Sequence, residues 1–162
     1  MSFKAGLGQD SHRFEEGTNK PLILGGIKIP SRLPLRGNSD SDVVLHALCN
    51  AISSISGKNI LGRYADRLCK EGITDSKIYV KEALKTLKDY RITHVSIAIE
   101  CLRPKISPHL GKMRSKIAEI LEVKKNDVGI TVTTGEGLSE FGQGKGIQAL
   151  VVVTTIPLSS SK

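Results

Sequence analysis

Apolar residues alternate with polar or small ones in several parts of the chain, which is the pattern of half-buried strands. The clearest run contains Val95, Ile97 and Ile99 and predicts a strand over residues 92–101. The same pattern predicts strands over residues 4–10, 128–133 and 147–156. Residues 21–30 are expected to form a hairpin, because two short apolar runs flank Gly25-Gly26.

Other stretches repeat apolar residues at helical spacing. The first such helix is predicted over residues 44–55 and ends at Gly57. Ser39, Asp40 or Ser41 is expected to cap its start, since these side chains accept hydrogen bonds from free backbone N–H groups.

Two further helices are predicted downstream of the first. One covers residues 76–90, with Asp75 or Ser76 as its cap, and the other covers about residues 108–122. Residues 59–74 follow neither the helical nor the strand pattern, and we expect them to be irregular. No internal repeat is visible in the sequence.

The mixture of helices and strands lacks strict βαβ alternation, which predicts an α+β fold. We expect a two-layer sandwich, with a mixed β-sheet carrying helices on one face. The 162 residues suffice for one domain with a sizeable core, expected over residues 1–158, with residues 159–162 as a disordered tail. No apolar run is long enough to span a membrane and the N-terminus does not resemble a signal peptide, so a cytoplasmic protein is expected.

The charge balance narrows the classes of partner. The net charge is +8, which suits an anionic partner. Aromatic residues make up only 4% of the chain and Trp is absent, so the stacking groups typical of nucleic-acid readers are scarce. A phosphorylated small molecule therefore fits the composition better than a nucleic acid or a membrane. The three cysteines form no Cys-x-x-Cys pair, which argues against a cysteine-based zinc site.

Asp10 and His12 form the first candidate site. Residues two apart in a strand project from the same face, so the carboxylate and the imidazole can lean toward a common point. His46, in the first turns of a predicted helix, offers a third ligand. Three protein ligands with one open position describe a catalytic zinc site, although a hydrogen-bonded core histidine is the alternative for His46. Asp40 or Asp42 is expected to orient one of these imidazoles without binding the metal itself.

The run Thr133-Thr134-Gly135-Glu136-Gly137 directly follows a predicted strand. Its hydroxyls and free backbone N–H groups suit a diphosphate. Glu136 would repel phosphate unless it holds a second, hard cation such as Mg²⁺. From the residues alone, an ordinary turn fits this run equally well.

A third candidate is the run from Arg103 to His109, where proline stiffens the end of a strand and Lys105 supplies a charge. A nucleotide base or phosphate fits there, and a turn bounded by prolines is the alternative.

With these segments placed, the chain resembles the 2-C-methyl-D-erythritol 2,4-cyclodiphosphate synthase family over nearly its whole length. The resemblance rests on several runs taken together: Gly8-Gln9-Asp10-Ser11-His12-Arg13-Phe14, Leu24-Gly25-Gly26, Ser39-Asp40-Ser41-Asp42-Val43-Val44-Leu45-His46, Asp75-Ser76, Pro104-Lys105 and Thr133-Thr134-Gly135-Glu136-Gly137-Leu138. It implies a homotrimer with active sites between subunits. It also implies the cyclisation of 4-diphosphocytidyl-2-C-methyl-D-erythritol 2-phosphate with loss of CMP.

The resemblance also implies roles for individual residues. Asp10, His12 and His46 would hold Zn²⁺, and Glu136 would hold Mg²⁺ or Mn²⁺ between the substrate phosphates. Asn38, Thr133, Thr134 and Glu136 would take part in the reaction. Contacts to the cytidine diphosphate substrate are implied for Asp10, His12, Asn38, Ser39, Gly62, Cys101, Pro104, Lys105, Ile106, Ser107, Thr133 and Thr134.

Four positions differ from what is usual in that family. Asn38 stands in place of a histidine, Asn50 and Ile60 in place of aspartates, and Gln143 in place of an arginine. Two other functions remain open on the sequence: a zinc-dependent phosphodiesterase that uses a metal-bound water, and a basic binding module with a structural metal.

Overall fold

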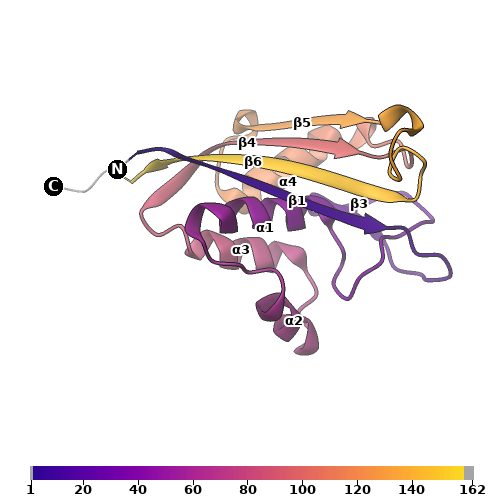
Figure 1. Cartoon of the computed structure of the whole chain (residues 1–162), viewed down its shortest axis with the longest axis horizontal. Helices are drawn as coiled ribbons and strands as arrows, with labels where there is room; N and C mark the ends of the chain where they lie inside the picture. Colours follow the sequence, from indigo (N-terminus) through magenta and orange to yellow (C-terminus); the bar gives the residue numbers. More distant parts are fainter. Residues whose placement is uncertain (1, 159–162) are drawn as a thin grey trace.

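The computed structural model describes residues 2–158, so the tail expected at residues 159–162 lies outside the described part. A four-stranded sheet has the order β1 (Lys4–Arg13), β6 (Gly146–Pro157), β4 (Tyr90–Glu100), β5 (Val128–Thr133). The β4–β5 pair is parallel and the other pairs are antiparallel, which confirms the predicted mixed sheet (Figure 1). A separate hairpin joins β2 (Leu22–Leu24) and β3 (Ile27–Ile29), as predicted.

Helices cover one face of this sheet. Of these, α1 (Val43–Ser56) and α4 (Leu110–Leu121) pack on the sheet, α3 (Ser76–Lys85) packs on α1 and α4, and α2 (Arg63–Lys70) extends beyond α3 (Figure 1). Short 3-10 turns occupy Ser107–His109, Lys125–Asp127 and Gly135–Gly137. No helix within residues 2–158 has the length and apolar character needed to cross a membrane.

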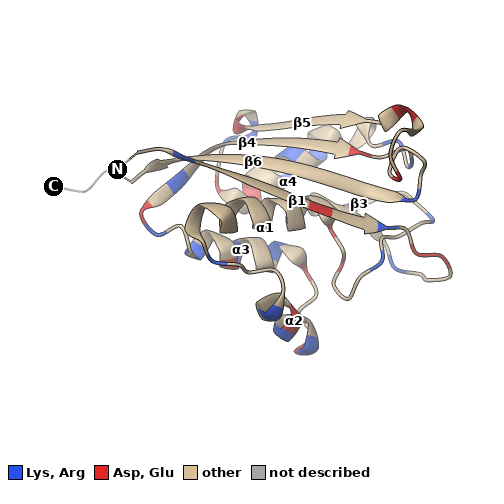
Figure 2. Ribbon diagram, viewed as in Figure 1, with Lys and Arg blue, Asp and Glu red and all other residues tan. Residues whose placement is uncertain are grey.

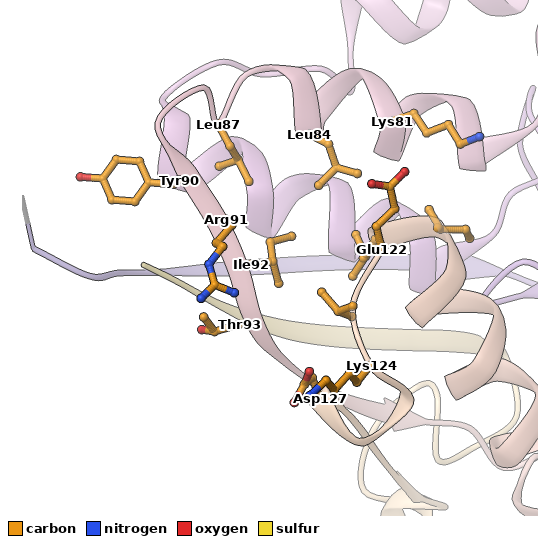
Figure 3. A pocket seen from close by; sticks show the side chains of 13 residues that line it. Lys81, Leu84, Leu87, Tyr90, Arg91, Ile92, Thr93, Glu122, Lys124 and Asp127 are labelled. Atoms are coloured by element: carbon orange, nitrogen blue, oxygen red, sulfur yellow. The ribbon is translucent and has the colours of Figure 1, made fainter. Parts of the chain in front are cut away.

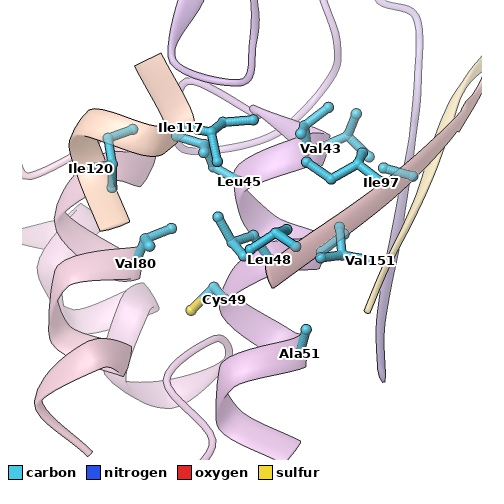
Figure 4. Packing of buried hydrophobic residues seen from close by; sticks show 14 of the residues in the cluster. Val43, Leu45, Leu48, Cys49, Ala51, Val80, Ile97, Ile117, Ile120 and Val151 are labelled. Carbon is cyan, nitrogen blue, oxygen red and sulfur yellow. The ribbon is translucent and has the colours of Figure 1, made fainter. Parts of the chain in front are cut away.

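The core lies between the sheet and the helices. Alternate strand residues such as Ile97 and Val151 point into it and meet Leu45 and Leu48 of α1 (Figure 4). Val80 of α3 and the α4 residues Ile117 and Ile120 close the far side of the same cluster. The period of two in the strands and the helical period in α1 therefore meet in one buried layer.

Two glycines of β1 let α1 approach the sheet closely. A Cβ atom added to Gly8 would lie 2.1 Å from the Ala47 carbonyl oxygen, and one added to Gly6 would lie 2.2 Å from that of Ala51. Neither position has room for a side chain. The close approach matters for the site below, because His46 precedes Ala47 on α1.

Within residues 2–158, no helix lies on the other face of the sheet (Figure 1). Leu7, Leu150 and Val152 point outward there and are 62%, 40% and 39% exposed. The middle of the sheet is nearly free of charge, whereas Lys, Arg, Asp and Glu are interspersed on the helices (Figure 2). Leu150 and Val152 share this face with polar residues such as Ser96 and Thr131.

Some boundaries and caps differ from the sequence predictions. Asp42 caps α1, because its side chain accepts from Val44 N and Leu45 N; the expected caps Ser39, Asp40 and Ser41 were wrong. Asp75 caps α3, in agreement with prediction. The helix predicted to reach residue 90 ends at Lys85, and Tyr90 already begins β4.

The stretch over residues 59–74 was expected to be irregular and instead contains α2. This helix has only eight residues, four of them charged, although the apolar residues Leu61, Tyr64, Ala65, Leu68 and Cys69 do follow helical spacing over a short stretch. The error matters because α2 contributes to the site.

Candidate active site

Three side chains predicted as metal ligands converge at the edge of the sheet. His12 Nε2 lies 2.8 Å and His46 Nδ1 lies 3.1 Å from the same oxygen of Asp10, Oδ2. The two imidazole nitrogens are 3.2 Å apart. Asp10 and His12 project from β1 and His46 from the first turns of α1, so the close packing of α1 on β1 assembles the group.

The geometry of this group fits a metal ion. With zinc–ligand bonds of about 2.0–2.1 Å, neighbouring ligand atoms of a tetrahedral site lie about 3.3 Å apart. The three measured spacings are close to that value, and one oxygen with two nitrogens is a donor set that zinc accepts. Within residues 2–158, this is the one group of three His, Cys, Asp or Glu residues close enough together to hold a metal.

Both imidazoles are oriented by hydrogen bonds on their other ring nitrogen. His12 Nδ1 donates to the carbonyl oxygen of Arg36 at 2.8 Å. His46 Nε2 lies 2.8 Å from Ser76 Oγ, and the Ser76 hydroxyl in turn donates to Asp40. Each ring therefore turns its remaining nitrogen toward Asp10. Of the two carboxylates expected behind a ligand, Asp40 acts on His46 through Ser76.

Asp42 has a different task. Its buried carboxylate accepts hydrogen bonds from the backbone N–H groups of Gly25, Gly26, Val44 and Leu45 at 2.6–3.1 Å. It thereby joins the β2–β3 hairpin to the start of α1 and fixes the turn from which His46 projects.

The charges of the ligand group favour a bound cation. Burial on its own raises the pKa of Asp10, but the hydrogen bonds from His12 and His46 outweigh burial and lower this pKa to about 2. Burial also opposes the charged form of His12, yet the Asp10 hydrogen bond raises the His12 pKa above its ordinary value. Asp10 is thus ionised at neutral pH. Its negative charge favours either a proton on His12 or a metal ion in place of that proton.

The ligand group opens into a pocket of 250 Å³. Asn38, Ser39 and Gly62, all predicted as substrate-binding residues, line this pocket. Sequence reasoning missed Ala65, Asp66 and Cys69 of α2, and Tyr79 of α3, which also line it. The spacing of Leu61, Ala65 and Cys69 at intervals of four was the available signal for this wall.

The departures Asn50 and Ile60 have structural explanations. Asn50 Nδ2 donates to the Gln9 carbonyl oxygen at 3.0 Å, a bond that an ionised aspartate cannot make. Ile60 is 8% exposed and belongs to the core, so it is not one of the polar groups of the pocket. The α2 carboxylate Asp66 is the acidic group that the pocket has beside Asp10.

The other predicted residues meet at the opposite edge of the sheet. Thr133 and Thr134 line a pocket of 360 Å³ together with Cys101, Pro104, Lys105, Ile106 and Ser107. The backbone here joins the two segments, since Cys101 N donates to the Thr133 carbonyl oxygen at 3.0 Å. This pocket shares no residue with the pocket of the metal ligands.

Glu136 follows Thr134 by two residues, does not line this pocket and is exposed. Its backbone φ is +51°, a left-handed conformation that costs about 1 kcal/mol for a residue other than glycine. The surrounding loop holds this conformation: Ser139 Oγ donates to the Glu100 carboxylate and accepts from Gly142 N at 3.0 Å. Gln143, another departure, donates from Nε2 to the Gly137 carbonyl oxygen at 3.2 Å.

The two clusters lie at opposite edges of the sheet. β1 and β5 are the outer strands of the sheet, with two strands between them. At about 4.8 Å per strand spacing, they lie about 14 Å apart. Asp10 and Val132 are in the same row of the sheet through Ala149 and Ile99, so the separation is across the strands rather than along them.

A pocket of 680 Å³ lies at the other end of the sheet (Figure 3). Leu84, Leu87 and Ile92 form part of its apolar wall, and Arg91 and Glu122 lie among its charged groups. It contains none of the predicted site residues, and its cations and carboxylates are mixed. Size alone therefore does not mark it as the reactive site.

The chain is similar to known proteins in both sequence and fold. The 2-C-methyl-D-erythritol 2,4-cyclodiphosphate synthase of Chlamydia muridarum (strain MoPn / Nigg) is 49% identical over 157 residues, covering 95% of this chain and 88% of the relative. A solved structure of 2C-methyl-D-erythritol-2,4-cyclodiphosphate synthase in a CDP-bound form has a TM-score of 0.84 at 29% identity, covering 94% of this chain and 100% of that one.

A bifunctional protein is also similar. The structure of the bifunctional IspDF from Campylobacter jejuni has a TM-score of 0.87 at 28% identity, and the match covers 96% of this chain but 42% of that longer chain. The model of the YgbB family matches residues 3–156, nearly the whole described chain. The chain therefore belongs to the YgbB family.

Proposed function

We propose that this protein converts 4-diphosphocytidyl-2-C-methyl-D-erythritol 2-phosphate to 2-C-methyl-D-erythritol 2,4-cyclodiphosphate and CMP. The observation that carries the proposal is the Asp10–His12–His46 group in a chain 49% identical to a synthase of that name. In the reaction, an oxygen of the 2-phosphate attacks the β-phosphorus, and the bond from that phosphorus to the α-phosphate oxygen breaks. CMP leaves with the bonding electron pair, so no oxidant or water is consumed.

The metal site supports this chemistry. Asp10, His12 and His46 would hold zinc, which when bound supplies positive charge to a phosphate oxygen. Asn38 and Ser39 border the same pocket, and the exposed amide of Asn38 can donate a hydrogen bond to the diphosphate. Asn38 does not titrate, so its proposed role is to hold the phosphate rather than to move a proton.

The second pocket would take the other end of the substrate. Its 360 Å³ hollow is bounded by Pro104, Ile106 and Cys101, which suits a flat nucleobase, and Lys105 adds a positive charge. The Thr133 and Thr134 hydroxyls would donate to the diphosphate. Glu136 would hold Mg²⁺ or Mn²⁺ together with substrate phosphates, since such ions typically take one or two carboxylates plus phosphate oxygens.

The separation of the two clusters supports shared active sites. A diphosphate cannot reach across about 14 Å of sheet, so the β1 edge of one copy must meet the β5 edge of another. A closed ring of copies satisfies every edge in this way, and we propose a homotrimer. The uncovered sheet face with Leu7, Leu150 and Val152 provides apolar surface for that assembly.

Incubation with the diphosphocytidyl substrate tests the function directly. The proposal expects CMP and the cyclic diphosphate in equal amounts, because the nucleophile is held within the substrate itself. CMP with a linear product would instead indicate a phosphodiesterase, and no turnover with metal still bound would indicate a binding module.

Glu136→Gln tests the second cation site. Without its carboxylate the loop loses its charged ligand, so about tenfold more Mg²⁺ should be needed for half-maximal turnover, while zinc content stays the same. Glu140→Gln is the matched control, since Glu140 is an exposed carboxylate nearby that pairs with Lys145. An identical Mg²⁺ titration for the two variants would rule out the assignment of Glu136.

A further inference from the structure

Lys20 occupies an unusual position for a lysine. It lies in the connection between β1 and β2, and its Nζ atom is 3.2 Å from the Leu35 carbonyl oxygen, 3.1 Å from that of Gly37 and 2.7 Å from Ser41 Oγ. An ammonium group has three N–H donors, so all three are used. The three acceptors belong to one loop, residues 35–41.

The two halves of that loop are held differently. The first half is fixed by backbone bonds to the end of β1: Glu15 N donates to the Pro34 carbonyl oxygen and Arg36 N to that of Arg13, both at 2.9 Å. Among the described residues, no backbone–backbone hydrogen bond involves residues 37–39. Beyond them, Asp40 N donates to the Thr74 carbonyl oxygen at 2.9 Å, so the loop is anchored at both ends. Lys20 spans the stretch without backbone bonds, with contacts at Leu35 and Gly37 on one side and at Ser41 on the other.

This loop presents three groups to the metal site. The Arg36 carbonyl oxygen accepts from His12 Nδ1, and Asn38 and Ser39 line the pocket. Gly37 is exposed but has no room for a side chain: a Cβ atom added there would lie 2.4 Å from Ser41 Oγ and 3.5 Å from His12 Cε1. Movement of the loop near Gly37 would therefore change the surroundings of the His12 ring.

We propose that Lys20 is a positioning residue for the metal site: its three hydrogen bonds hold the 35–41 loop so that it orients His12 and presents Asn38 to the substrate. Lys20 touches neither the ligand group nor the expected substrate. Its effect on turnover rests on the proposed function, whereas its effect on zinc affinity does not.

Whether zinc affinity falls or rises when Lys20 is replaced distinguishes a positioning role of Lys20 from a purely electrostatic one. The positive charge of Lys20 lies close enough to His12 to work against protonation of that ring. If charge were the whole contribution, removing it should strengthen the binding of a dication. If Lys20 positions His12, removing it should weaken zinc binding, because groups that orient metal ligands are worth about 10–100-fold in affinity.

The experiment compares Lys20→Met, which keeps the apolar stem, with Lys20→Arg and with Lys28→Met as control, since Lys28 is exposed on β3. Zinc dissociation constants of the metal-free proteins are measured by chelator competition. We expect binding to weaken about tenfold in Lys20→Met and to be unchanged in Lys28→Met. Lys20→Arg should fall between them, because a planar fork cannot place three donors around one nitrogen position.

Turnover and product binding complete the test. In Lys20→Met, kcat should fall at least about tenfold at saturating zinc, while CMP affinity stays within about twofold, since the cytidine pocket lies at the other edge of the sheet. Unchanged or tighter zinc binding in Lys20→Met would overturn the proposal, and if that variant does not fold, unweakened binding in Lys20→Arg would do so. Failure of the proposed function is a separate result, namely an unmodified protein that binds zinc and does not turn over.

Discussion

Replacing His46 with alanine is expected to remove both bound zinc and turnover while leaving the chain folded. His46 would supply one of the three ligand atoms of the Asp10–His12–His46 group, and no other such group occurs within the described residues. A catalytic metal contributes several kcal/mol of charge stabilisation in the transition state, and each 1.4 kcal/mol is tenfold in rate. We therefore expect turnover to fall about 10³-fold or more, with zinc per chain, measured by elemental analysis, falling in parallel.

The controls separate loss of metal from loss of fold. His46 is part of the buried start of α1, but its ring lies at the pocket rather than in the apolar cluster, so the thermal midpoint of His46→Ala should stay near that of the metal-free unmodified protein. Asp10→Ala should repeat the loss of zinc, whereas Asp89→Ala, an exposed carboxylate in the turn before β4, should keep it. Full zinc occupancy in His46→Ala would show that the ligand assignment is wrong.

Asn38 is the position where a second large effect is expected. If its amide donates to the diphosphate in the transition state, Asn38→Ala should lower turnover about 10²-fold, the usual cost of one lost donor of that kind. Zinc content should not change, because Asn38 lines the pocket without belonging to the ligand group. Asn126→Ala is the matched control, because Asn126 is exposed and does not line the pocket.

Histidine at the same position tests what the site requires. Asn38→His keeps a donor and adds a group that titrates near pH 6.5. If holding the phosphate is the only task, turnover should be similar and a new pH-dependent limb should appear between about pH 6 and 7. A large gain in turnover would instead mean that the position has to move a proton, and that the role given to Asn38 here is wrong.

The sequence predicted the strands and helices that have one clearly buried face. The alternation around Val95 and Ile97 and the helical spacing after Val44 each describe a segment with one buried face, and both segments formed where expected. The helix α2 was missed because its apolar stripe is short and half of its eight residues are charged, although Tyr64, Leu68 and Cys69 pack against the core at helical spacing. The cap of α1 was missed because it depends on a contact between distant segments. The backbone N–H groups of Gly25 and Gly26 in the hairpin donate to the Asp42 carboxylate and hold it at the start of the helix.

The residues of the candidate metal site could be proposed from the sequence, but their arrangement in space could not be derived from it. Asp10 and His12 are two residues apart in a strand, so their shared direction follows from the sequence. That His46 meets them depends on the packing permitted by Gly6 and Gly8, a contact between distant segments. The contribution of Lys20 depends in the same way on a loop conformation that no local pattern encodes.

Sharing of the active site between copies is the central claim, and mixed assembly of inactive variants tests it most directly. One chain carries His46→Ala, and the other carries Thr134→Ala with Glu136→Ala, so each retains one intact half. If every site joins the metal half of one copy to the diphosphate half of its neighbour, random one-to-one assembly leaves about one site in four fully intact. Purification of the co-expressed chains by two different tags then keeps only mixed trimers, each with one intact site in three, so turnover should recover to about a third of the unmodified level.

The matched control combines His46→Ala with Asp10→Ala, whose defects lie in the same half, and it should recover nothing. Restored cyclisation in the first mixture and none in the second is the result expected for metal ligands and diphosphate loop contributed by different copies. A first mixture no more active than its two components would contradict shared sites and would require both halves to act within one chain.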